Sequence, residues 1–258
     1  MMTKTMSRAV VVTGGGRGIG RAVALAFAVP GNLVVITGRT VAPLEETARA
    51  IEAKGATAIV LQMDVTDEAS VASSLGSLHG RVPSIDVLVN NAGVGGGENV
   101  QGSDVARWKN TIDTNLTGMF LVTRALLPIV AEGGRIINMS SVLGRFGAPG
   151  YTAYCASKHG VIGFTRALAL EVLKRKITVN ALAPGWVETE MAVLGMTQGA
   201  SHSKVTYEQF KERSLAAVPI KRIIQPEEVA GLVNYLASAD AGAITGQCFN
   251  IDGGQAMT

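Results

Sequence analysis

Cysteine is nearly absent from this chain of 258 residues, which contains only Cys155 and Cys248. The two lie far apart and match neither a disulfide framework nor the spacing of metal ligands. We therefore expect no metal site, and a reducing, cytoplasmic environment suits the chain. The three histidines, His79, His159 and His202, also lack the spacing that a metal site or a serine triad requires.

Long apolar runs and an excess of one charge are missing as well. The apolar run at 22–29 is less than half a membrane span, and the stretch at 9–12 is too short for a signal-peptide core. Charged residues make up 17%, with 23 Lys and Arg against 20 Asp and Glu, a net charge of +3. Without a basic stripe, this balance gives no reason to expect nucleic acid or a membrane as a partner.

Hydrophobic residues are abundant, at 47%, which is too apolar for a disordered chain. Short β-branched runs recur at 9–13, 33–37, 58–62, 85–90, 135–139, 177–183 and 248–251. Helical periodicity fills 19–29, 42–54, 68–78, 104–130, 151–174 and 226–237. This alternation predicts an α/β protein of the Rossmann type, with a doubly wound parallel sheet and helices on both faces. No linker interrupts it, so we expect a single domain over 1–258.

The segment at 186–215 interrupts the last strand–helix alternation with apolar residues among small and polar ones. An insertion after the carboxyl end of a strand lies over the crevice where doubly wound sheets bind ligands. We interpret it as a mobile substrate lid. The alternative is a surface excursion that packs its own apolar residues.

A glycine-rich turn follows the first predicted strand and opens the first predicted helix. Glycines permit a tight turn, and their backbone N–H groups approach a pyrophosphate that the helix N-terminus stabilises. The spacing is Gly-x-x-x-Gly-x-Gly, which predicts a dinucleotide site with moderate specificity. The residues expected to bind the cofactor here are Gly14, Gly16, Arg17, Gly18, Ile19 and Gly20.

The second predicted strand ends without the acidic residue that usually binds the ribose hydroxyls of NAD. Arg39 stands next to its end, and Arg39 together with Arg17 is suited to hold the 2′-phosphate of NADP. The predicted cofactor is therefore NADP(H). Asp64 and Val65, after the third strand, are expected at the adenine, and Asn91, after the fourth, is expected to hold nearby backbone beside the cofactor.

Tyr154 and Lys158 lie four residues apart on a predicted helix and so share one face. A nearby ammonium group lowers the pKa of a phenol, and we expect Lys158 to act on Tyr154 in this way. Tyr154 is then suited to give a proton to a ketone oxygen, or to accept one in the reverse direction. Tyr151 is set aside because position 155 is a cysteine. Ser141, after the fifth strand, is expected to polarise the substrate carbonyl, with Ser140 as the alternative.

Asn115 lies within the predicted helix 104–130, close to Gly118. Both residue types are poor helix formers in a helix interior. We expect this pair to bend the helix and to free a carbonyl group for a water that supplies protons to Lys158.

These motifs together resemble those of the short-chain dehydrogenase/reductase family along essentially the whole chain. The resemblance rests on the glycine turn, on Asn115, Ser141, Tyr154 and Lys158, on Pro184, Gly185 and Thr189, and on the terminal Asp252-Gly253-Gly254. It implies a seven-stranded sheet, hydride transfer from a nicotinamide and a homotetramer. It also implies that Pro184, Gly185, Val187 and Thr189 contact the carboxamide end of the cofactor.

Within that family the chain is most similar to 3-oxoacyl reductases and polyketide ketoreductases, at residues 157–160 and 186–189. It departs from carrier-protein reductases at 129–133, where they commonly carry a basic run. The apolar residues predicted to form the walls of the substrate pocket are Val94, Val142, Leu143, Phe146, Trp186 and Met191.

Three functions remain open at this point. The leading one is NADPH-dependent reduction of a 3-oxoacyl, cyclic or aryl ketone, with Tyr154 as the proton donor. The second is oxidation of a secondary alcohol by the same residues with NADP, because a catalyst lowers one barrier for both directions. The third is a nucleotide sensor that has lost turnover, and intact Ser141, Tyr154 and Lys158 argue against it.

Overall fold

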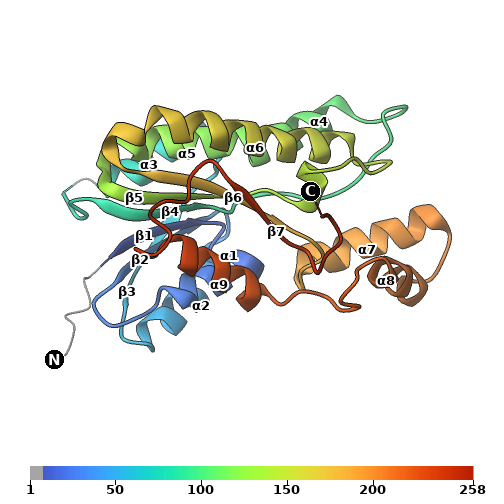
Figure 1. Cartoon of the computed structure of the whole chain (residues 1–258), viewed down its shortest axis with the longest axis horizontal. Coiled ribbons are helices and arrows are strands. Elements are labelled where there is room, and N and C mark those ends of the chain that lie inside the picture. Colours follow the sequence, from blue (N-terminus) through green and yellow to red (C-terminus); the bar gives the residue numbers. More distant parts are fainter. Residues whose placement is uncertain (1–7, 79, 258) are drawn as a thin grey trace.

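A parallel sheet runs through the computed structural model, which describes residues 8–78 and 80–257. Over these residues seven strands pair in the order β3-β2-β1-β4-β5-β6-β7, and every pairing is parallel (Figure 1). The strands are β1 (Ala9–Thr13), β2 (Leu33–Gly38), β3 (Thr57–Gln62), β4 (Ile85–Asn90), β5 (Val130–Met139), β6 (Thr178–Pro184) and β7 (Cys248–Ile251). The predicted doubly wound, seven-stranded fold is confirmed.

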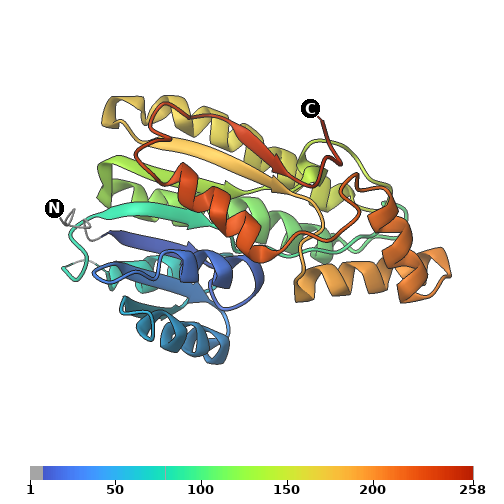
Figure 2. The same cartoon turned by 60° about the horizontal axis from the view of Figure 1, so that its bottom comes forward.

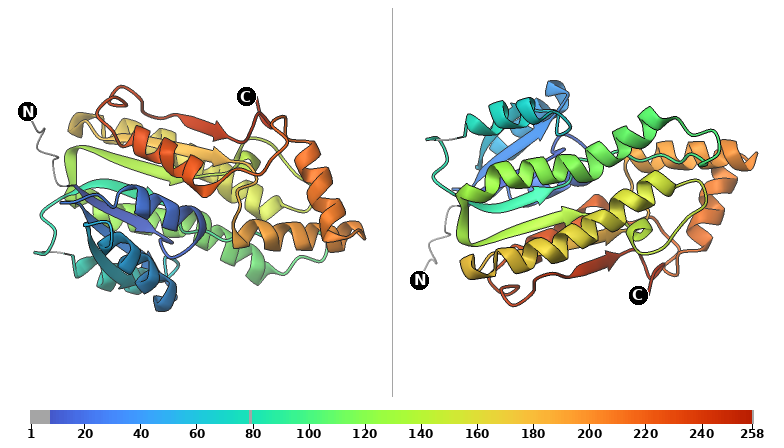
Figure 3. Two further views of the ribbon diagram at one scale, coloured as in Figure 1. Left: turned by 90° about the horizontal axis from the view of Figure 1, so that it is seen from below. Right: turned by 90° about the horizontal axis from the view of Figure 1, so that it is seen from above.

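Helices cover both faces of the sheet (Figure 3). One face carries α1 (Gly18–Ala26), α2 (Val41–Glu52) and α9 (Pro226–Leu236). The other carries α3 (Glu68–Gly76), α5 (Gly118–Leu126) and α6 (Thr152–Glu171), which the short η4 (Leu173–Arg175) follows. Helix α4 (Val105–Ile112) packs against α6. Two separate hydrophobic cores result, one on each side of the sheet.

The sequence of strand β1 is continuously apolar because both faces of the strand are buried. Val10 and Val12 belong to the core beneath α1 and α9, whereas Val11 belongs to the core on the opposite side. All three side chains are fully buried. Because successive side chains of a strand point to opposite faces, a strand covered on both faces requires an apolar residue at each position.

The predicted helix at 104–130 is the element that the structure corrects most. A π-helical turn (Asp113–Thr117) separates α4 from α5, and a 3₁₀ turn, η2 (Leu127–Ile129), follows α5. Position 118, the first residue of α5, needs a glycine because the helix lies close to the segment after β3: a Cβ added there would lie 2.7 Å from Val65 Cγ2. Strand β5 begins at Val130, not at residue 135, because Val130 pairs with Ile85 across a register shift.

The excursion at 186–215 is largely helical. It contains α7 (Glu190–Ser203) and most of α8 (Tyr207–Ala216), which pack against each other beyond the carboxyl ends of the strands (Figure 2). Its function as a lid stays a prediction. Across the described part of the chain, no helix has the length and apolarity needed to cross a membrane.

Candidate active site

The glycine turn forms an open cradle between β1 and α1. Gly14 and Gly18 have φ of +67° and +50°, conformations that favour glycine. Arg17 is the N-cap residue of α1, and its side chain makes no capping hydrogen bond. Among the described residues, the first N–H groups of α1 are thus left open by the N-cap, which is the arrangement that binds a phosphate at a helix N-terminus.

Asn91 connects the ends of β4 and β1. Its Nδ2 donates to the carbonyl oxygens of Thr13, at 3.0 Å, and Gly14, at 3.3 Å. In return, Oγ1 of Thr13 accepts from the backbone N–H groups of Asn91 and Ala92. The expectation that this amide holds neighbouring backbone is met, and it sets the position of the glycine turn relative to the centre of the sheet.

A pocket of about 330 Å³ opens at the carboxyl ends of the strands. All six predicted wall residues line it: Val94, Val142, Leu143, Phe146, Trp186 and Met191. The predicted site residues that also line it are Ile19, Asn91, Ser141, Tyr154, Lys158, Pro184, Gly185, Val187 and Thr189. Residues from five separate parts of the sequence thus meet in one cavity.

Tyr154, Ser141 and Lys158 meet inside this pocket. Helix α6 carries the tyrosine and the lysine, and Lys158 Nζ lies 5.6 Å from the centre of the Tyr154 ring. Ser141, in the turn after β5, lies close enough to the Tyr154 side chain to affect its pKa. The alternative serine, Ser140, donates its Oγ to the Lys158 carbonyl oxygen at 2.9 Å, so its hydroxyl is directed at the helix backbone.

The pKa of Tyr154 moves opposite to the sequence-based expectation. Burial raises it, and the nearby Ser141 hydroxyl only partly opposes this rise. Lys158 Nζ donates to the Met139 carbonyl oxygen at 2.9 Å. A phenol with a raised pKa keeps its proton at neutral pH and can serve as an acid.

Lys158 is buried, with 5% of its surface exposed, and burial lowers its pKa to about 8. An unfolded chain, with an ordinary lysine pKa near 10.4, therefore binds more protons than the folded one between pH 8 and 10. This group costs stability below pH 8, and the cost disappears as the pH rises to 10. At about 1.36 kcal/mol per pKa unit, it is of the order of 3 kcal/mol at pH 7.

We expect Lys158→Met to raise the free energy of unfolding by about 1–3 kcal/mol at pH 7. The substitution removes the cost of burying the charged ammonium group, and the lost hydrogen bond to Met139 offsets part of this gain. The gain should shrink at pH 9.5. Urea unfolding at the two pH values measures it, with Lys174→Met, at an exposed position, as the control. Equal changes at both pH values would contradict the assigned burial cost.

Asn115 lies in the π-helical turn and is 2% exposed. Its Oδ1 accepts from the Val94 N–H at 2.8 Å, and its Nδ2 donates to the Val94 carbonyl oxygen and to Ser157 Oγ. The side chain therefore holds the pocket wall at Val94 against α6. The bend expected near Asn115 coincides with this π-helical turn, and the expected use of a freed carbonyl group to hold a water stays a prediction.

A buried polar ladder positions α6 on the sheet. Asn90 Nδ2 donates to Thr123 Oγ1 and to Asn138 Oδ1, at 2.9 and 2.8 Å. Asn138 Nδ2 donates in turn to Thr165 Oγ1 of α6, at 2.9 Å. Because buried amides lose free energy when they are unpaired, these bonds favour one placement of α6, and hence of Tyr154, relative to β4 and β5.

The residues predicted at the adenosine end lie away from the pocket. Arg39 is exposed after β2, and its charge reaches Asp64. Burial acts to raise the pKa of Asp64, but hydrogen bonds from Thr66 and the Arg39 charge outweigh it, so the pKa is lowered. Arg17 pairs with Glu190 of α7 at 2.6 Å, a contact between the glycine turn and the predicted lid.

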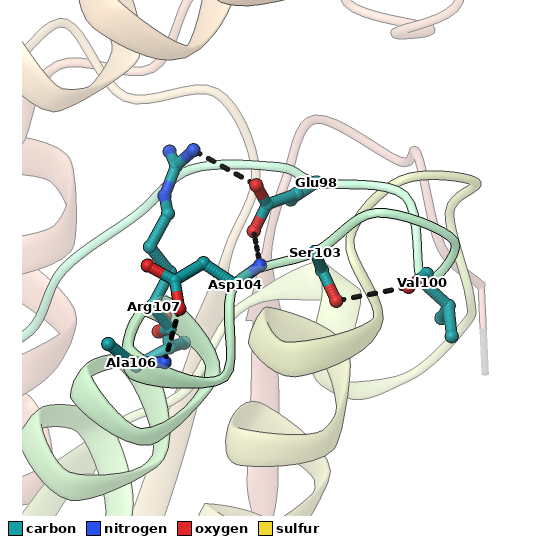
Figure 4. Close-up of polar contacts among 7 residues, drawn as sticks. Glu98, Val100, Ser103, Asp104, Ala106 and Arg107 are labelled. Atoms are coloured by element: carbon teal, nitrogen blue, oxygen red, sulfur yellow. Dashed lines mark hydrogen bonds and ion pairs between the residues drawn. The ribbon is translucent and has the colours of Figure 1, made fainter.

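The loop at 98–104, which precedes α4, is held by the contacts that Figure 4 shows. Glu98 accepts from the backbone N–H of Asp104 at 3.3 Å and from Arg107 at 3.2 Å. Ser103 donates to the Val100 carbonyl oxygen at 3.1 Å. These bonds close the loop on the start of α4 and support the adjacent glycines at 95 and 96, which line the pocket.

Several pocket residues were missed by the sequence reasoning. Tyr151, set aside as a decoy, lines the pocket, as do Phe210 of α8 and Gln255 after β7. The position of Gln255 directly after the terminal Asp252-Gly253-Gly254 was the signal that could have found it. Within the described ranges, no cluster of His, Cys, Asp or Glu could hold a metal ion. His79 lies outside those ranges.

Comparison with known proteins agrees with this geometry. Residues 14–256 match the family model described as enoyl-(acyl carrier protein) reductase. The chain is 42% identical to a protein described as a ketoacyl reductase of the monensin polyketide synthase from Streptomyces virginiae, over 98% of both chains. It is 40% identical to a 3-oxoacyl-[acyl-carrier-protein] reductase from Synechocystis, over 99% of this chain and 100% of that one.

A solved structure of a ketoreductase has the same fold. The crystal structure of a variant of actinorhodin polyketide ketoreductase with NADPH has a TM-score of 0.94 to this chain, with 37% identity and full coverage of both chains. Fold, family model and relatives therefore agree, and the chain belongs to the short-chain dehydrogenase/reductase family of oxidoreductases.

Proposed function

We propose that this chain is an NADPH-dependent ketoreductase in which Tyr154 donates the proton. The observation that carries the proposal is the convergence of Tyr154, Ser141 and Lys158 on an apolar pocket beside the glycine turn. The relatives support it, since two are described as ketoacyl or 3-oxoacyl reductases and the ketoreductase of similar structure was crystallised with NADPH.

The residues present fit a dinucleotide. The glycine turn has the positive φ values and the uncapped helix start that a pyrophosphate requires. We assign the pyrophosphate to Gly14, Gly16, Gly18, Ile19 and Gly20, the adenosine and its 2′-phosphate to Arg17, Arg39, Asp64 and Val65, and the nicotinamide half to Asn91, Tyr154, Lys158, Pro184, Gly185, Val187 and Thr189. When bound, NADPH supplies a hydride.

Residues of this chain hold and donate the proton. Tyr154 Oη holds it: a phenol is protonated at neutral pH, and burial keeps the pKa of this one above its usual range. The Ser141 hydroxyl, close to Tyr154, is placed to receive the substrate oxygen beside the phenol and to set its angle. Lys158 stands below the phenol ring as a cation that stabilises negative charge forming there. A protonated phenol is the form that ketone reduction requires, and the same oxygen accepts a proton when an alcohol is oxidised.

Turnover of ketones by the purified protein tests the proposal. The protein is mixed with NADPH and a panel of cyclic, aryl and 3-oxoacyl thioester ketones, and the loss of NADPH absorbance is followed. We expect consumption with apolar cyclic or aryl ketones, since the walls are mostly apolar. Tight NADPH binding without turnover of any ketone, or of any secondary alcohol with NADP, would support a sensor instead.

Cofactor choice is expected to depend on Arg39. Charge-assisted bonds to a phosphate contribute roughly 1.5–3 kcal/mol each, so Arg39→Asp should lower the NADPH/NADH ratio of kcat/KM by about tenfold to a hundredfold. Steady-state kinetics with both cofactors measure the ratio. Arg49→Asp, a charge change of the same size on α2, serves as the control. An unchanged ratio in Arg39→Asp would remove this residue from the phosphate site.

We also propose that the chain assembles as a homotetramer through its long helices. Large apolar side chains are exposed there: Trp108 on α4 and Phe120 on α5 each at 42%, and Leu170 on α6 at 72%. A second copy would cover them. Light scattering on the eluting protein should give the mass of four chains of 26.7 kDa. A single-chain mass would contradict the assembly.

A further inference from the structure

Aromatic side chains are scarce in this chain but concentrated around the pocket. Aromatic residues make up 5% of the sequence, and five of them line the pocket: Phe146, Tyr151, Tyr154, Trp186 and Phe210. Trp186 and Phe210 come from the segment beyond β6, where α7 and α8 lie side by side (Figure 2). Both residues are only partly buried, so their rings keep accessible surface at the pocket wall.

Helix α7 supports both of these rings on one face. Gly195 and Gly199 lie four residues apart on this helix, so they occupy neighbouring positions on the same face. A Cβ added at Gly195 would lie 3.6 Å from Cζ3 of Trp186. One added at Gly199 would lie 2.2 Å from Cζ of Phe210 and 2.7 Å from both of its Cε atoms. The indole and the phenyl ring therefore rest next to each other on α7.

Phe210 depends on the glycine beneath it, whereas Trp186 does not. Carbon atoms pack at about 3.5–4.0 Å, so a methyl side chain at position 195 would make an ordinary contact with the indole. The tip of the Phe210 ring, by contrast, occupies the space that any side chain at position 199 would take. Gly199 is not among the described residues that line the pocket. Its influence on a ligand in the pocket therefore acts through the position of the Phe210 ring.

Hydrogen bonds hold the backbone at both rings. The carbonyl oxygen of Trp186 accepts from the backbone N–H of Ile224 at 2.8 Å. A capping box fixes the start of α8: Thr206 Oγ1 accepts from the Gln209 N–H, and Gln209 Oε1 accepts from the Thr206 N–H. Phe210 follows directly, and its N–H donates to the Thr206 carbonyl oxygen at 3.0 Å. Rings carried by fixed backbone lose less conformational freedom when a ligand binds.

Aromatic rings pack on one another in offset-stacked or edge-to-face arrangements, and such a pair favours an aromatic partner over an aliphatic one by about two- to tenfold. We propose that Trp186 and Phe210 form an aromatic wall that binds an aromatic ring of the substrate, and that Gly199 is the positioning residue that seats Phe210 in this wall. The inference rests on the proposed ketoreductase activity and narrows its substrate to ketones that carry an aromatic ring. An aliphatic 3-oxoacyl chain gains no such contact.

Two ketones with the same carbon skeleton test the proposal. In 2-tetralone the ring fused to the cyclic ketone is aromatic, in trans-2-decalone it is saturated, and in neither compound is the carbonyl group conjugated with it. The ratio of kcat/KM for 2-tetralone to that for trans-2-decalone is compared between the wild-type protein and its variants, so the intrinsic reactivities of the two ketones cancel. We expect Phe210→Leu, which keeps an apolar side chain, to lower this ratio by about two- to tenfold, mainly through KM.

Gly199→Ala should lower the ratio to a similar extent by displacing the ring. In a protein that already carries Phe210→Leu, Gly199→Ala should have little further effect, because the ring that the added Cβ meets is gone. Loosened packing of α7 and α8 would instead lower kcat/KM for both ketones together. Equal falls in the ratio with and without the phenyl ring would show that Gly199 does not act through Phe210.

Tyr207→Leu is the matched control. Tyr207 lies one turn earlier on α8 and is also partly buried, but it is not among the described residues that line the pocket. Its removal should leave the ratio unchanged. An unchanged ratio in Phe210→Leu, an equal fall in Tyr207→Leu, or a wild-type protein that reduces other ketones but not 2-tetralone would overturn the aromatic wall. If no ketone in the wider panel is reduced, the failure belongs to the proposed function.

Discussion

Tyr154→Phe is expected to lower kcat/KM for ketone reduction by about 10²–10⁴-fold, the usual contribution of a positioned acid. The substitution removes the hydroxyl group and keeps the shape of the ring, so packing on α6 is preserved. The affinity for NADPH should change little, because the glycine turn and Arg39 are untouched. Stopped-flow or steady-state absorbance assays measure the rate, and fluorescence titration measures the binding.

Tyr151→Phe is the informative companion. Tyr151 lines the same pocket and also has a pKa raised by burial, but Ser141 contributes only to the pKa of Tyr154. If proton transfer depends on the hydroxyl group beside Ser141, Tyr151→Phe should lower kcat/KM for ketone reduction by no more than a few-fold. Comparable losses in the two variants, or full activity in Tyr154→Phe, would show that another group provides the proton.

Gly20→Ala is expected to disrupt the cofactor cradle. An added Cβ would lie 2.1 Å from the Gly14 carbonyl oxygen and 2.5 Å from Asn91 Nδ2, so the turn or the helix must shift. Overpacking of this kind typically costs about 1–3 kcal/mol of stability. Because the shift displaces the N–H groups that face the phosphates, we expect the affinity for NADPH to fall at least tenfold, as measured by titration calorimetry.

Gly231→Ala provides the comparison on α9, the helix that packs beside α1. Nothing lies within 4 Å of a Cβ added there. Since alanine favours a helix interior over glycine by about 1 kcal/mol, thermal unfolding should show a stabilised protein with unchanged NADPH affinity. A Gly20→Ala protein that binds NADPH as tightly as Gly231→Ala does would rule out the cradle as the binding site.

For the glycine turn, the sequence predicts the position in the fold but not the contacts with distant segments. Its position after β1 follows from local pattern, because a strand, a run of glycines and a helix are adjacent in the chain. The pairing of Arg17 with Glu190 does not follow from it, because 173 residues separate the two. Only the fold brings α7 beside the start of α1. The same limit applies to Asn115, whose partners Val94 and Ser157 come from two other segments.

Side-chain spacing on α6 likewise indicated that Tyr154 and Lys158 share a face, but not the direction in which the pKa of the phenol moves. A cation close in sequence suggested a lowered pKa. In the folded protein, burial raises the pKa of Tyr154 and Lys158 Nζ bonds to Met139. Desolvation depends on everything packed around a group, and spacing along one helix carries no information about it.

The sequence by itself determined the order and type of the strands, the parallel sheet and the residue types that reach its carboxyl edge, since these follow from periodicity and from chirality of the backbone. Only the tertiary structure decided that the bend expected near Asn115 is a π-helical turn between α4 and α5, and that Ser140, of the two candidate serines, bonds to the backbone of α6. Such outcomes depend on contacts between distant segments, whose geometry no local pattern encodes.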